Sequence, residues 1–340
     1  MTVVGIIANP AAGRDIRRLV AHASVFDNNE KVNIVRRVLM GLEAVGVRKA
    51  WIMPDAYGIG RKALDALRLN LEVRFVEMSP RFEEGDSVEA AARMVEAGAR
   101  TLITLGGDGT NRAVAKACGA IPLMPISTGT NNAFPVMVEG TLAGLAAGLT
   151  AMGVVPLEVA TTSTKRIDLW RGGTLEEIAL VDAVVYRERF IASRAVWRLD
   201  EVKMALFTRA EPWNIGLSAI GGYLEATPLA ADEGLYVEMG EGGCEVLAPV
   251  APGVIHAVKV AAHRRVRLGE RIVVVDCAPA LIALDGERKV TLKAGEPIEL
   301  CVTASGPRVI EIRRTLSYAA AVGAFIRESL PTDGKASRSS

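Results

Sequence analysis

The sequence predicts two domains: an α/β N-terminal domain with a Rossmann-like parallel sheet, followed by a β-rich, sandwich-like C-terminal domain. The chain has 340 residues, of which 50% are hydrophobic, and this is longer than most single domains. Short apolar runs alternate with longer amphipathic ones over residues 1–155, as in a parallel sheet covered by helices. β-branched segments separated by glycine and proline turns follow over 156–312, which favours antiparallel strands.

In the first domain, the apolar runs are interpreted as strands and the segments with a helical period as helices. The expected strands are 3–8, 49–53, 72–78, 101–105 and 122–126. Apolar stripes predict helices over 30–46 and 88–99. Gly46 and Gly98 then stand at the C-terminal caps of these helices.

The second part of the chain contains two further segments with a helical pattern. One helix is predicted over 193–210, among the strands, and the apolar segment over 313–330 predicts a terminal helix. The last residues, 331–340, are polar and rich in turn formers, so we expect them to be disordered.

Composition and charge exclude several classes of partner. The chain carries 40 basic and 39 acidic residues, so no global field draws it to nucleic acid or to an anionic membrane. It has no uncharged apolar span near the ~20 residues that cross a bilayer, and its N-terminus lacks the basic region of a secretory signal. We therefore expect a soluble, cytoplasmic protein, and a homo-oligomer such as a dimer.

The cysteines predict buried thiols in a reducing compartment. They are Cys118, Cys244, Cys277 and Cys301. No two of them form a CxxC pair, and no histidine stands at the spacing of an ordinary zinc site.

A glycine-rich loop containing one acid follows the predicted strand over 101–105. Glycines at 106 and 107 can adopt backbone angles closed to other residues and let a ligand approach the main chain. Thr110 or Asn111 is a suitable N-cap for the helix that follows, and such a helix N-terminus attracts phosphate. Because a carboxylate there would repel phosphate, Asp108 is interpreted as a general base or a magnesium partner. An Asp-Gly turn is the structural alternative.

A second polar loop, STGTNNAFP over 127–135, follows the next predicted strand. Its hydroxyl groups, at Ser127, Thr128 and Thr130, can contact phosphate, and Asn131 and Asn132 can bind a ribose, a hydroxyl or an amide. Loops that follow adjacent parallel strands lie at the same edge of the sheet, so the two loops are expected to face each other across a crevice.

The loop after the first strand is a third candidate. Asn9, Pro10 and Gly13 end the strand, and Arg14, Arg17 and Arg18 follow at a helical spacing. Neutralisation of phosphate and an ordinary solvated helix start are both consistent with these arginines.

A further glycine pattern, GIGRKA over 58–63, fits the GxGxxA turn of dinucleotide-binding folds. Residues 54–57 separate it from its strand, so the glycines do not form the tight turn that meets a pyrophosphate, and we interpret the pattern as a helix start. The sequence contains no Walker A motif, which argues against ATP binding by a P-loop.

Three motifs, ANPAAG (8–13), GGDGTN (106–111) and PISTGTNNAFP (125–135), together resemble the superfamily of the NAD kinases and the diacylglycerol and sphingosine kinases. LDGER (284–288) adds to the resemblance, because both branches carry Asp-Gly-Glu or Asp-Gly-Gln in their second domain. Within the superfamily, the chain most resembles the acetoin-catabolism X branch, which is labelled ATP-NAD kinase-like.

The resemblance implies transfer of a phosphoryl group from ATP, or from polyphosphate, to a hydroxyl group with Mg²⁺. It places the active site between the two domains and returns the C-terminal segment to the first domain. Asp108 would accept the proton of the acceptor hydroxyl, and Glu287 would be a second carboxylate near the reacting centre. No metal ligand is assigned. The predicted set for nucleotide and phosphate binding is Asn9, Pro10, Gly13, Arg14, Gly106, Gly107, Gly109, Thr110, Asn111, Ser127, Thr128, Gly129, Thr130, Asn131 and Asn132.

Two departures from the superfamily leave the acceptor open. NAD kinases carry a downstream Asn-Glu pair that binds the nucleoside, and this chain has no convincing copy of it; lipid kinases carry an Asp where Asn132 stands. The leading hypothesis is a soluble kinase that acts on NAD or on another small hydroxyl compound. A lipid kinase is the first alternative, and the absence of a basic amphipathic helix disfavours it. A catalytically silent nucleotide-binding accessory protein is the second.

Overall fold

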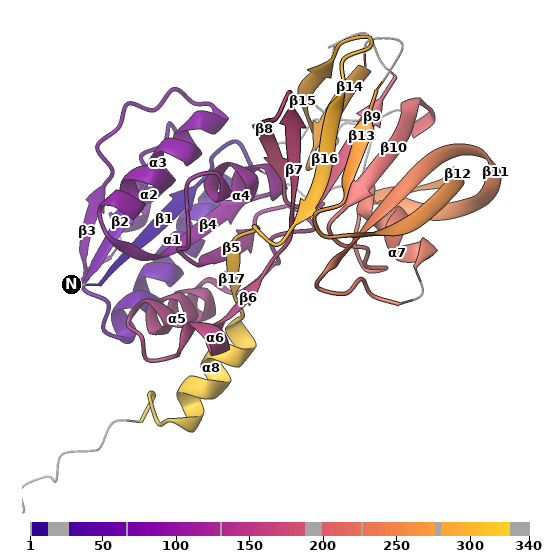
Figure 1. Ribbon diagram of the computed structural model, residues 1–340. Helices are drawn as coiled ribbons and strands as arrows, with labels where there is room; N and C mark the ends of the chain where they lie inside the picture. Colours follow the sequence, from indigo (N-terminus) through magenta and orange to yellow (C-terminus); the bar gives the residue numbers. More distant parts are fainter. Residues whose placement is uncertain are drawn as a thin grey trace, which may run out of the picture.

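The computed structural model describes residues 2–12, 27–65, 67–129, 131–187, 199–225, 227–275 and 280–326. Two bodies lie side by side, an α/β body formed mainly by the first half of the chain and a β-rich body formed by the second (Figure 1). The predicted fold class is confirmed.

The first body is built on a seven-stranded sheet. In spatial order its strands are β3 (Glu72–Phe75), β2 (Lys49–Ile52), β1 (Val3–Ala8), β4 (Ala99–Gly106), β5 (Leu123–Ser127), β17 (Arg308–Ile310) and β6 (Thr161–Ser163). All neighbours pair in parallel except β17 and β6. β1 and β5 are buried along their whole length, which explains their continuous apolar runs.

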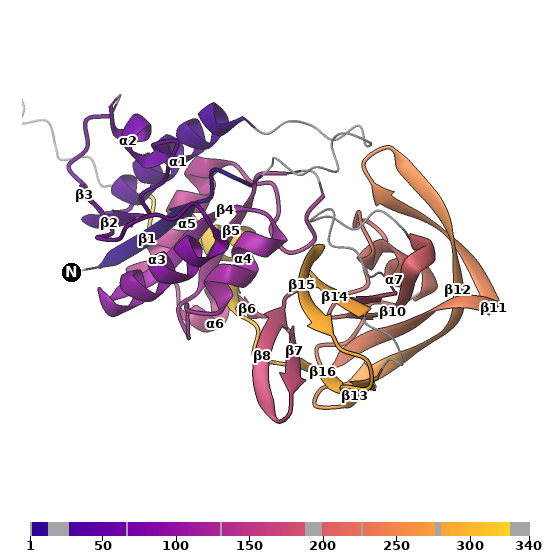
Figure 2. The same cartoon turned by 90° about the horizontal axis from the view of Figure 1, so that it is seen from above.

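Helices cover both faces of this sheet (Figure 2). The first face carries α1 (Asn28–Ala44), α2 (Ile59–Leu64) and α5 (Gly140–Ala151). The second carries α3 (Glu84–Glu96) and α4 (Asp108–Ala115). Gly46 and Gly98 follow α1 and α3 with φ of 94° and 83°, as expected for C-terminal glycines, and GIGRKA does begin a helix, α2.

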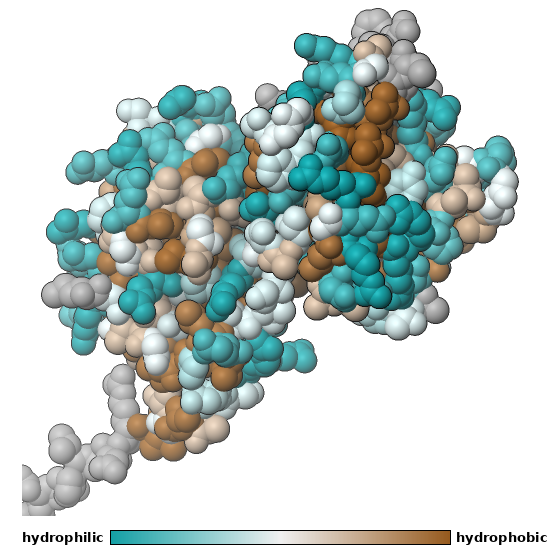
Figure 3. Space-filling view, viewed as in Figure 1, coloured by the Kyte–Doolittle hydropathy of each residue, from teal (hydrophilic) through white to brown (hydrophobic). Residues whose placement is uncertain are grey.

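The C-terminal segment contacts the first body. Strand β17 lies between β5 and β6, and α8 (Ile312–Ala321) packs on α5 and on the short α6 (Leu157–Ala160). β6 and β17 therefore complete the first sheet although they lie beyond residue 155, and the predicted domain limits stay predictions. Beyond α8, Val322, Phe325 and Ile326 are exposed. Figure 3 shows apolar residues at the lower end of the molecule, where α8 lies in Figure 1.

The second body contains two antiparallel sheets. The six-stranded sheet has the order β12 (Val254–Arg267), β11 (Glu233–Ala251), β10 (Val202–Phe207), β9 (Asp182–Tyr186), β14 (Ala280–Leu284) and β15 (Glu287–Leu292). The four-stranded sheet has the order β13 (Arg271–Val274), β16 (Ile298–Thr303), β7 (Arg166–Arg171) and β8 (Thr174–Ala179). Apolar residues of both sheets share one core, so the sheets pack face to face. The helix α7 (Ser218–Leu224) contacts β11.

Several sequence predictions are wrong or fall outside the described residues. The predicted helix over 193–210 is wrong, because β10 occupies 202–207 after a 3₁₀ turn (Leu199–Glu201). β10 is a central strand with a nearly continuous apolar run, and such a run fits a buried helix as well as a strand. Cys244 is exposed rather than buried, whereas Cys118 and Cys301 are buried, and burial raises the pKa of the Cys118 thiol to about 11. Cys277 and residues 331–340 lie outside the described residues.

Within the described ranges, no helix has the length and apolar character needed to cross a membrane.

Helices α1 and α5 approach each other closely through glycine. A Cβ atom at Gly144 would lie 2.4 Å from the Val38 carbonyl oxygen, and one at Gly41 would lie 2.5 Å from the Thr141 carbonyl oxygen. Because both obstacles are backbone atoms, a side chain at either position requires the helices to separate.

We predict that Gly144→Ala lowers the free energy of unfolding by about 1–3 kcal/mol, as overpacking does. Gly85→Ala is a matched control, because a Cβ there meets only the Glu83 side chain at 3.4 Å and Gly85 lies in α3. This control is expected to leave stability unchanged or to raise it by up to about 1 kcal/mol. Urea denaturation of both variants checks the pair, and equal effects would contradict the packing argument.

Candidate functional site

The loops after β1, β4 and β5 meet at the carboxyl edge of the first sheet. Gly106 pairs with Ser127 at the ends of β4 and β5. The Asn9 side-chain amide donates a hydrogen bond to Thr110 Oγ1 at 2.9 Å, which joins the loop after β1 to α4. The structure thus brings the described members of the predicted binding set together. Gly13, Arg14 and Thr130 lie outside the described residues, as do Arg17 and Arg18.

The glycines of the central loop serve a purpose other than the one expected. None of Gly106, Gly107 and Gly109 has a positive φ, so the prediction of special backbone angles is wrong. A Cβ at Gly106 would lie 2.4 Å from Thr110 Oγ1, and one at Gly107 would lie 2.7 Å from Asn132 Oδ1. The glycines are therefore required because other polar side chains of the site occupy the adjacent space.

The predicted N-cap is also wrong. Helix α4 begins at Asp108 with Gly107 as its N-cap, three or four residues before the predicted caps. The side chains of the two predicted caps have other partners: Thr110 accepts from Asn9, and Asn111 accepts from Thr104 and donates to the Gly107 carbonyl. These bonds fix the first turn of α4 against β1 and β4.

Asp108 ties the first turn of α4 to the loop after β5. Its Oδ1 accepts a hydrogen bond from the Phe134 amide at 2.8 Å, and the Ala133 amide is 3.1 Å from both Oδ1 and Oδ2. Arg209, from the second body, donates to the Ala133 carbonyl at 2.8 Å. The peptide at residue 133 is therefore held from both sides, and Asp108 has a structural partner whatever its role in chemistry.

The side-chain amide of Asn132 closes the loop after β5. Its Nδ2 donates to Ser127 Oγ at 2.8 Å and to the Gly129 carbonyl at 3.3 Å, and Ser127 Oγ donates to that same carbonyl at 2.9 Å. A carboxylate at position 132 could not donate either bond. Thr128 Oγ1 and Asn131 Oδ1 are buried and make no hydrogen bond to the described residues.

A buried lysine supports the loop after β1. Lys31 on α1 is fully buried, and its Nζ donates to the carbonyls of Asn9 and Ala12, at 2.9 and 2.6 Å, and to Asn28 Oδ1 at 3.0 Å. Because the ammonium group gathers two carbonyls of the NPAA segment, it bends this loop toward α1. The sequence analysis did not identify this residue, although a lysine four residues before Val35 on the apolar stripe of α1 was a signal.

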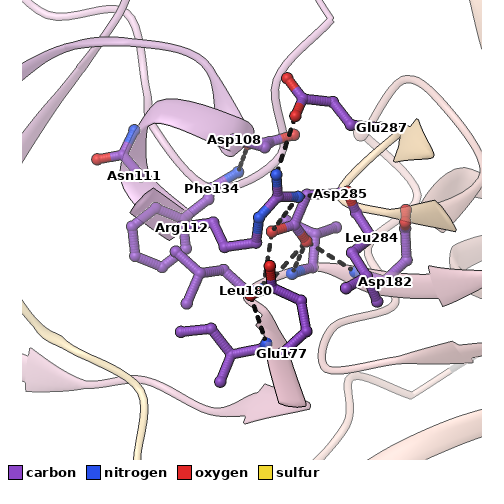
Figure 4. A network of polar contacts seen from close by, with 12 residues as sticks. Asp108, Asn111, Arg112, Phe134, Glu177, Leu180, Asp182, Leu284, Asp285 and Glu287 are labelled. Atoms are coloured by element: carbon purple, nitrogen blue, oxygen red, sulfur yellow. Dashed lines mark hydrogen bonds and ion pairs between the residues drawn. The ribbon is translucent and has the colours of Figure 1, made fainter. Parts of the chain in front are cut away.

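The second body contributes two carboxylates through the turn between β14 and β15 (Figure 4). Asp285, with φ of 51°, is buried and accepts hydrogen bonds from the amides of Leu180 and Val181, at 3.0 and 2.7 Å. Glu287 is about half exposed, and its Oε1 lies 2.7 Å from where a Cβ of Gly109 would be. Glu287 therefore stands against the first turn of α4, as the resemblance implied for a carboxylate from the second domain.

Arg112 lies between these acids and is fully buried. Its guanidinium donates to the Leu284 carbonyl and, at 2.9 Å, to Glu287 Oε2, and it lies 3.7 Å from Asp285 Oδ2. Burial raises the pKa of the Asp285 carboxyl from 3.8 to about 6; the Asp108 charge adds to this rise, while Arg112 and the Leu180 and Val181 amides oppose it. Arg112 was not among the predicted site residues, although its place four residues after Asp108 puts both on one face of α4.

Comparisons with known proteins follow the same division into two bodies. The family model described as the ATP-NAD kinase N-terminal domain matches residues 4–154, and the acetoin catabolism protein X C-terminal domain matches residues 165–305. The acetoin catabolism protein X of Cupriavidus necator is 39% identical over 333 residues, which cover 93% of this chain and 92% of that protein. The chain belongs to the acetoin catabolism protein X family.

Two solved structures are similar to the chain at low sequence identity. Yeast NADH kinase complexed with NADH is 12% identical, with a TM-score of 0.49 and coverage of 98% of this chain and 90% of that chain. An NAD kinase from Archaeoglobus fulgidus in complex with ATP is 15% identical, with a TM-score of 0.39 and coverage of 82% and 99%. The part of the chain with a kinase-like match is the N-terminal body, over residues 4–154.

We predict that Asn132→Asp destabilises the protein by about 1–3 kcal/mol, because a carboxylate removes the donor that Ser127 and Gly129 share and leaves acceptors facing one another. Asn132→Ala is the matched control, since it removes the donor without adding charge and should cost less. Thermal unfolding at pH 7.5 measures both variants. Wild-type stability of Asn132→Asp would show that the amide does not hold the loop.

The raised pKa of Asp285 predicts a pH-dependent stability. In the folded state the carboxyl keeps its proton up to about pH 6, whereas in the unfolded state it ionises near 3.8. This contribution is fully present below the unfolded pKa and is lost as pH rises through the folded pKa. Asp285→Asn cannot ionise, so the stability advantage of the wild type over this variant should shrink between about pH 4 and 7. Parallel stability curves would contradict the prediction.

Proposed function

We propose that the protein is a phosphotransferase that moves a phosphoryl group from ATP, or from polyphosphate, to a hydroxyl group of a small soluble metabolite, with NAD as the first candidate. The observation that carries this proposal is the meeting of Asp108, Glu287 and the N-terminus of α4 at the carboxyl edge of a parallel sheet. In open α/β folds this edge is where ligands bind, and a helix N-terminus there favours phosphate.

The loops around α4 suit the donor. Gly107 and Gly109 lie half-buried at the start of the helix, and the hydroxyl of Thr128 and the amide oxygen of Asn131 are buried polar atoms that make no hydrogen bond to the described residues. Phosphoryl transfer asks the protein mainly to position groups and to neutralise charge. These features support a nucleotide donor, and they leave the choice between ATP and polyphosphate open to experiment.

The carboxylates also fit a magnesium ion that arrives with the donor. Within the described residues, no group of three or more His, Cys, Asp or Glu side chains could hold a metal ion. Magnesium in phosphoryl-transfer sites needs only one or two carboxylates, because the phosphates and water complete its shell. When bound, the ion would neutralise charge on the transferring phosphoryl group.

Asp108 is the proposed base. Its carboxylate is held by the amides of Ala133 and Phe134 in the first turn of α4, at the edge of the sheet where an acceptor hydroxyl would approach. The hydrogen bonds from these two amides hold the carboxylate in one orientation, which is useful for a base that must align a nucleophile. Glu287 would lie beside the reacting centre as a second carboxylate.

The same bonds favour a second candidate function. Asp108 and Asn132 both have structural partners, which would be equally useful in a protein that binds a nucleotide without turning it over. A catalytically silent, nucleotide-binding accessory protein therefore stays an alternative.

We predict that Asp108→Asn abolishes phosphoryl transfer while nucleotide binding persists, because the side-chain amide keeps an oxygen for the Phe134 amide but cannot accept a proton at neutral pH. A thermal-shift screen with Mg-ATP and candidate metabolites identifies the acceptor first. Transfer is then followed by mass spectrometry of the product, and ATP binding by calorimetry.

Asp108→Ala separates the chemical role from the structural one. It removes every hydrogen bond between the carboxylate and the amides of Ala133 and Phe134, so it should lower the melting temperature and weaken ATP binding as well as transfer. Undiminished turnover in Asp108→Asn would reject the proposed base. A wild-type protein that binds Mg-ATP and phosphorylates no acceptor would favour the silent accessory protein.

A further inference from the structure

Arg112 of α4 forms ion pairs with both carboxylates of the β14–β15 turn. Its two terminal nitrogens have different tasks: Nη1 donates to the Leu284 carbonyl, and Nη2 donates to Glu287 Oε2 at 2.9 Å (Figure 4). Leu284 and Glu287 are the residues on either side of the Asp285-Gly286 turn. Arg112, from the first body, therefore donates hydrogen bonds to both strands of the β14–β15 hairpin in the second body.

The burial of Arg112 shows how much this contact matters to the fold. The side chain is 0% exposed, so its charge is removed from water, and such a charge is tolerated only where partners compensate for the lost hydration. Burial by itself lowers the pKa of Arg112, but the charges of Asp285, Glu287 and Glu84 raise it above its usual value. Two acids of the β14–β15 turn and one of α3 thus favour the charged form of Arg112.

The contact decides where the Glu287 carboxylate lies. Glu287 is about half exposed and could adopt several side-chain conformations, yet its Oε2 is bound to Arg112 while its Oε1 rests against Gly109. Gly109 directly follows Asp108 on α4. Arg112 therefore sets the position of Glu287 relative to Asp108, across the boundary between the two bodies.

We infer that Arg112 is a positioning residue, which holds the β14–β15 turn against α4 and orients Glu287 beside Asp108 for phosphoryl transfer. The inference deepens the proposed function and rests on it for the catalytic part. The claim that Arg112 holds the β14–β15 turn against α4 does not depend on the proposed function. A lysine cannot reproduce the arrangement, because it has one nitrogen where arginine offers a planar pair of donors.

The kinetic test uses the full chain with Arg112→Lys, Arg112→Met, Glu287→Gln and the double variant Arg112→Met/Glu287→Gln. Arg112→Met is expected to lower kcat by about 100-fold, as misplacement of a reacting group does, with KM for ATP changed less than about threefold. Arg112→Lys should fall between this variant and the wild type. In the Glu287→Gln background, Arg112→Met should add little further loss, because its effect passes through Glu287.

The matched control is Glu84→Gln. Glu84 on α3 also lies near Arg112, with Oε2 at 3.5 Å from Nη2, but it does not belong to the hairpin. This variant should retain kcat within about twofold, a change too small to indicate a lost transition-state interaction. If Arg112→Met does not fold, the same cycle is run with Arg112→Lys and judged by the same criterion of non-additivity with Glu287→Gln.

A second measurement does not depend on turnover. Hydrogen exchange of the full chain should speed up in Arg112→Met over residues 180–182, whose amides Asp285 binds, and over 284–287, while Glu84→Gln leaves both segments unchanged. Wild-type exchange in Arg112→Met would overturn the docking role. Wild-type kcat, or full additivity with Glu287→Gln, would overturn the positioning role. If the wild type transfers phosphate to no acceptor, the proposed function fails, and so does the role of Arg112 in orienting Glu287 for transfer. Hydrogen exchange then still decides whether Arg112 holds the β14–β15 turn against α4.

Discussion

The hydrogen bonds between Asp108 and the amides of Ala133 and Phe134 are the contact on which the rest of the site depends. They join the two loops that follow β4 and β5, and these loops carry most of the predicted binding residues. A carboxylate in the first turn of a helix is already in a favourable position, because the free amides there attract negative charge. The bonds to a second loop turn this local preference into a link between two segments, and the same carboxylate is thereby presented at the edge of the sheet.

Asp285 repeats this arrangement in the second body. It binds the amides of Leu180 and Val181 as Asp108 binds those of Ala133 and Phe134, and Arg112 of α4 lies 3.7 Å from its Oδ2. The hydrogen bonds of Asp108 fix the loops of the first body, and those of Asp285 fix the β14–β15 turn. Arg112 belongs to the same helix as Asp108, so one turn of α4 carries both the acid that binds the loop after β5 and the cation that binds the β14–β15 turn.

The sequence was sufficient to predict the fold class, and to predict that the loops of the candidate site lie at one edge of the sheet, because the period of the apolar residues and the positions of the glycines are local signals. It was insufficient wherever burial decided the outcome. The run at 202–207 became a strand because β9 and β11 enclose it, and Lys31 and Arg112 became buried cations because distant carbonyls and carboxylates surround them. The GGDG motif does follow β4 and begin α4, as predicted. The predicted reason for its glycines is wrong, because Gly107 makes room for the Asn132 side chain and does not adopt a special backbone angle.

The balance of charge in the site bears on the form of the donor. Asp285 and Glu287 lie against one guanidinium, and the pKa of Asp285 is raised by the burial of its carboxyl and further by the charge of Asp108. The N-terminus of α4 offsets only part of that charge, because Asp108 already uses it. A free polyphosphate chain would meet unfavourable carboxylates, whereas a metal-bound one would not. We therefore expect donor binding to depend on magnesium more steeply than a helix N-terminus alone would require, and this dependence would follow from the same acids that Arg112 holds in place.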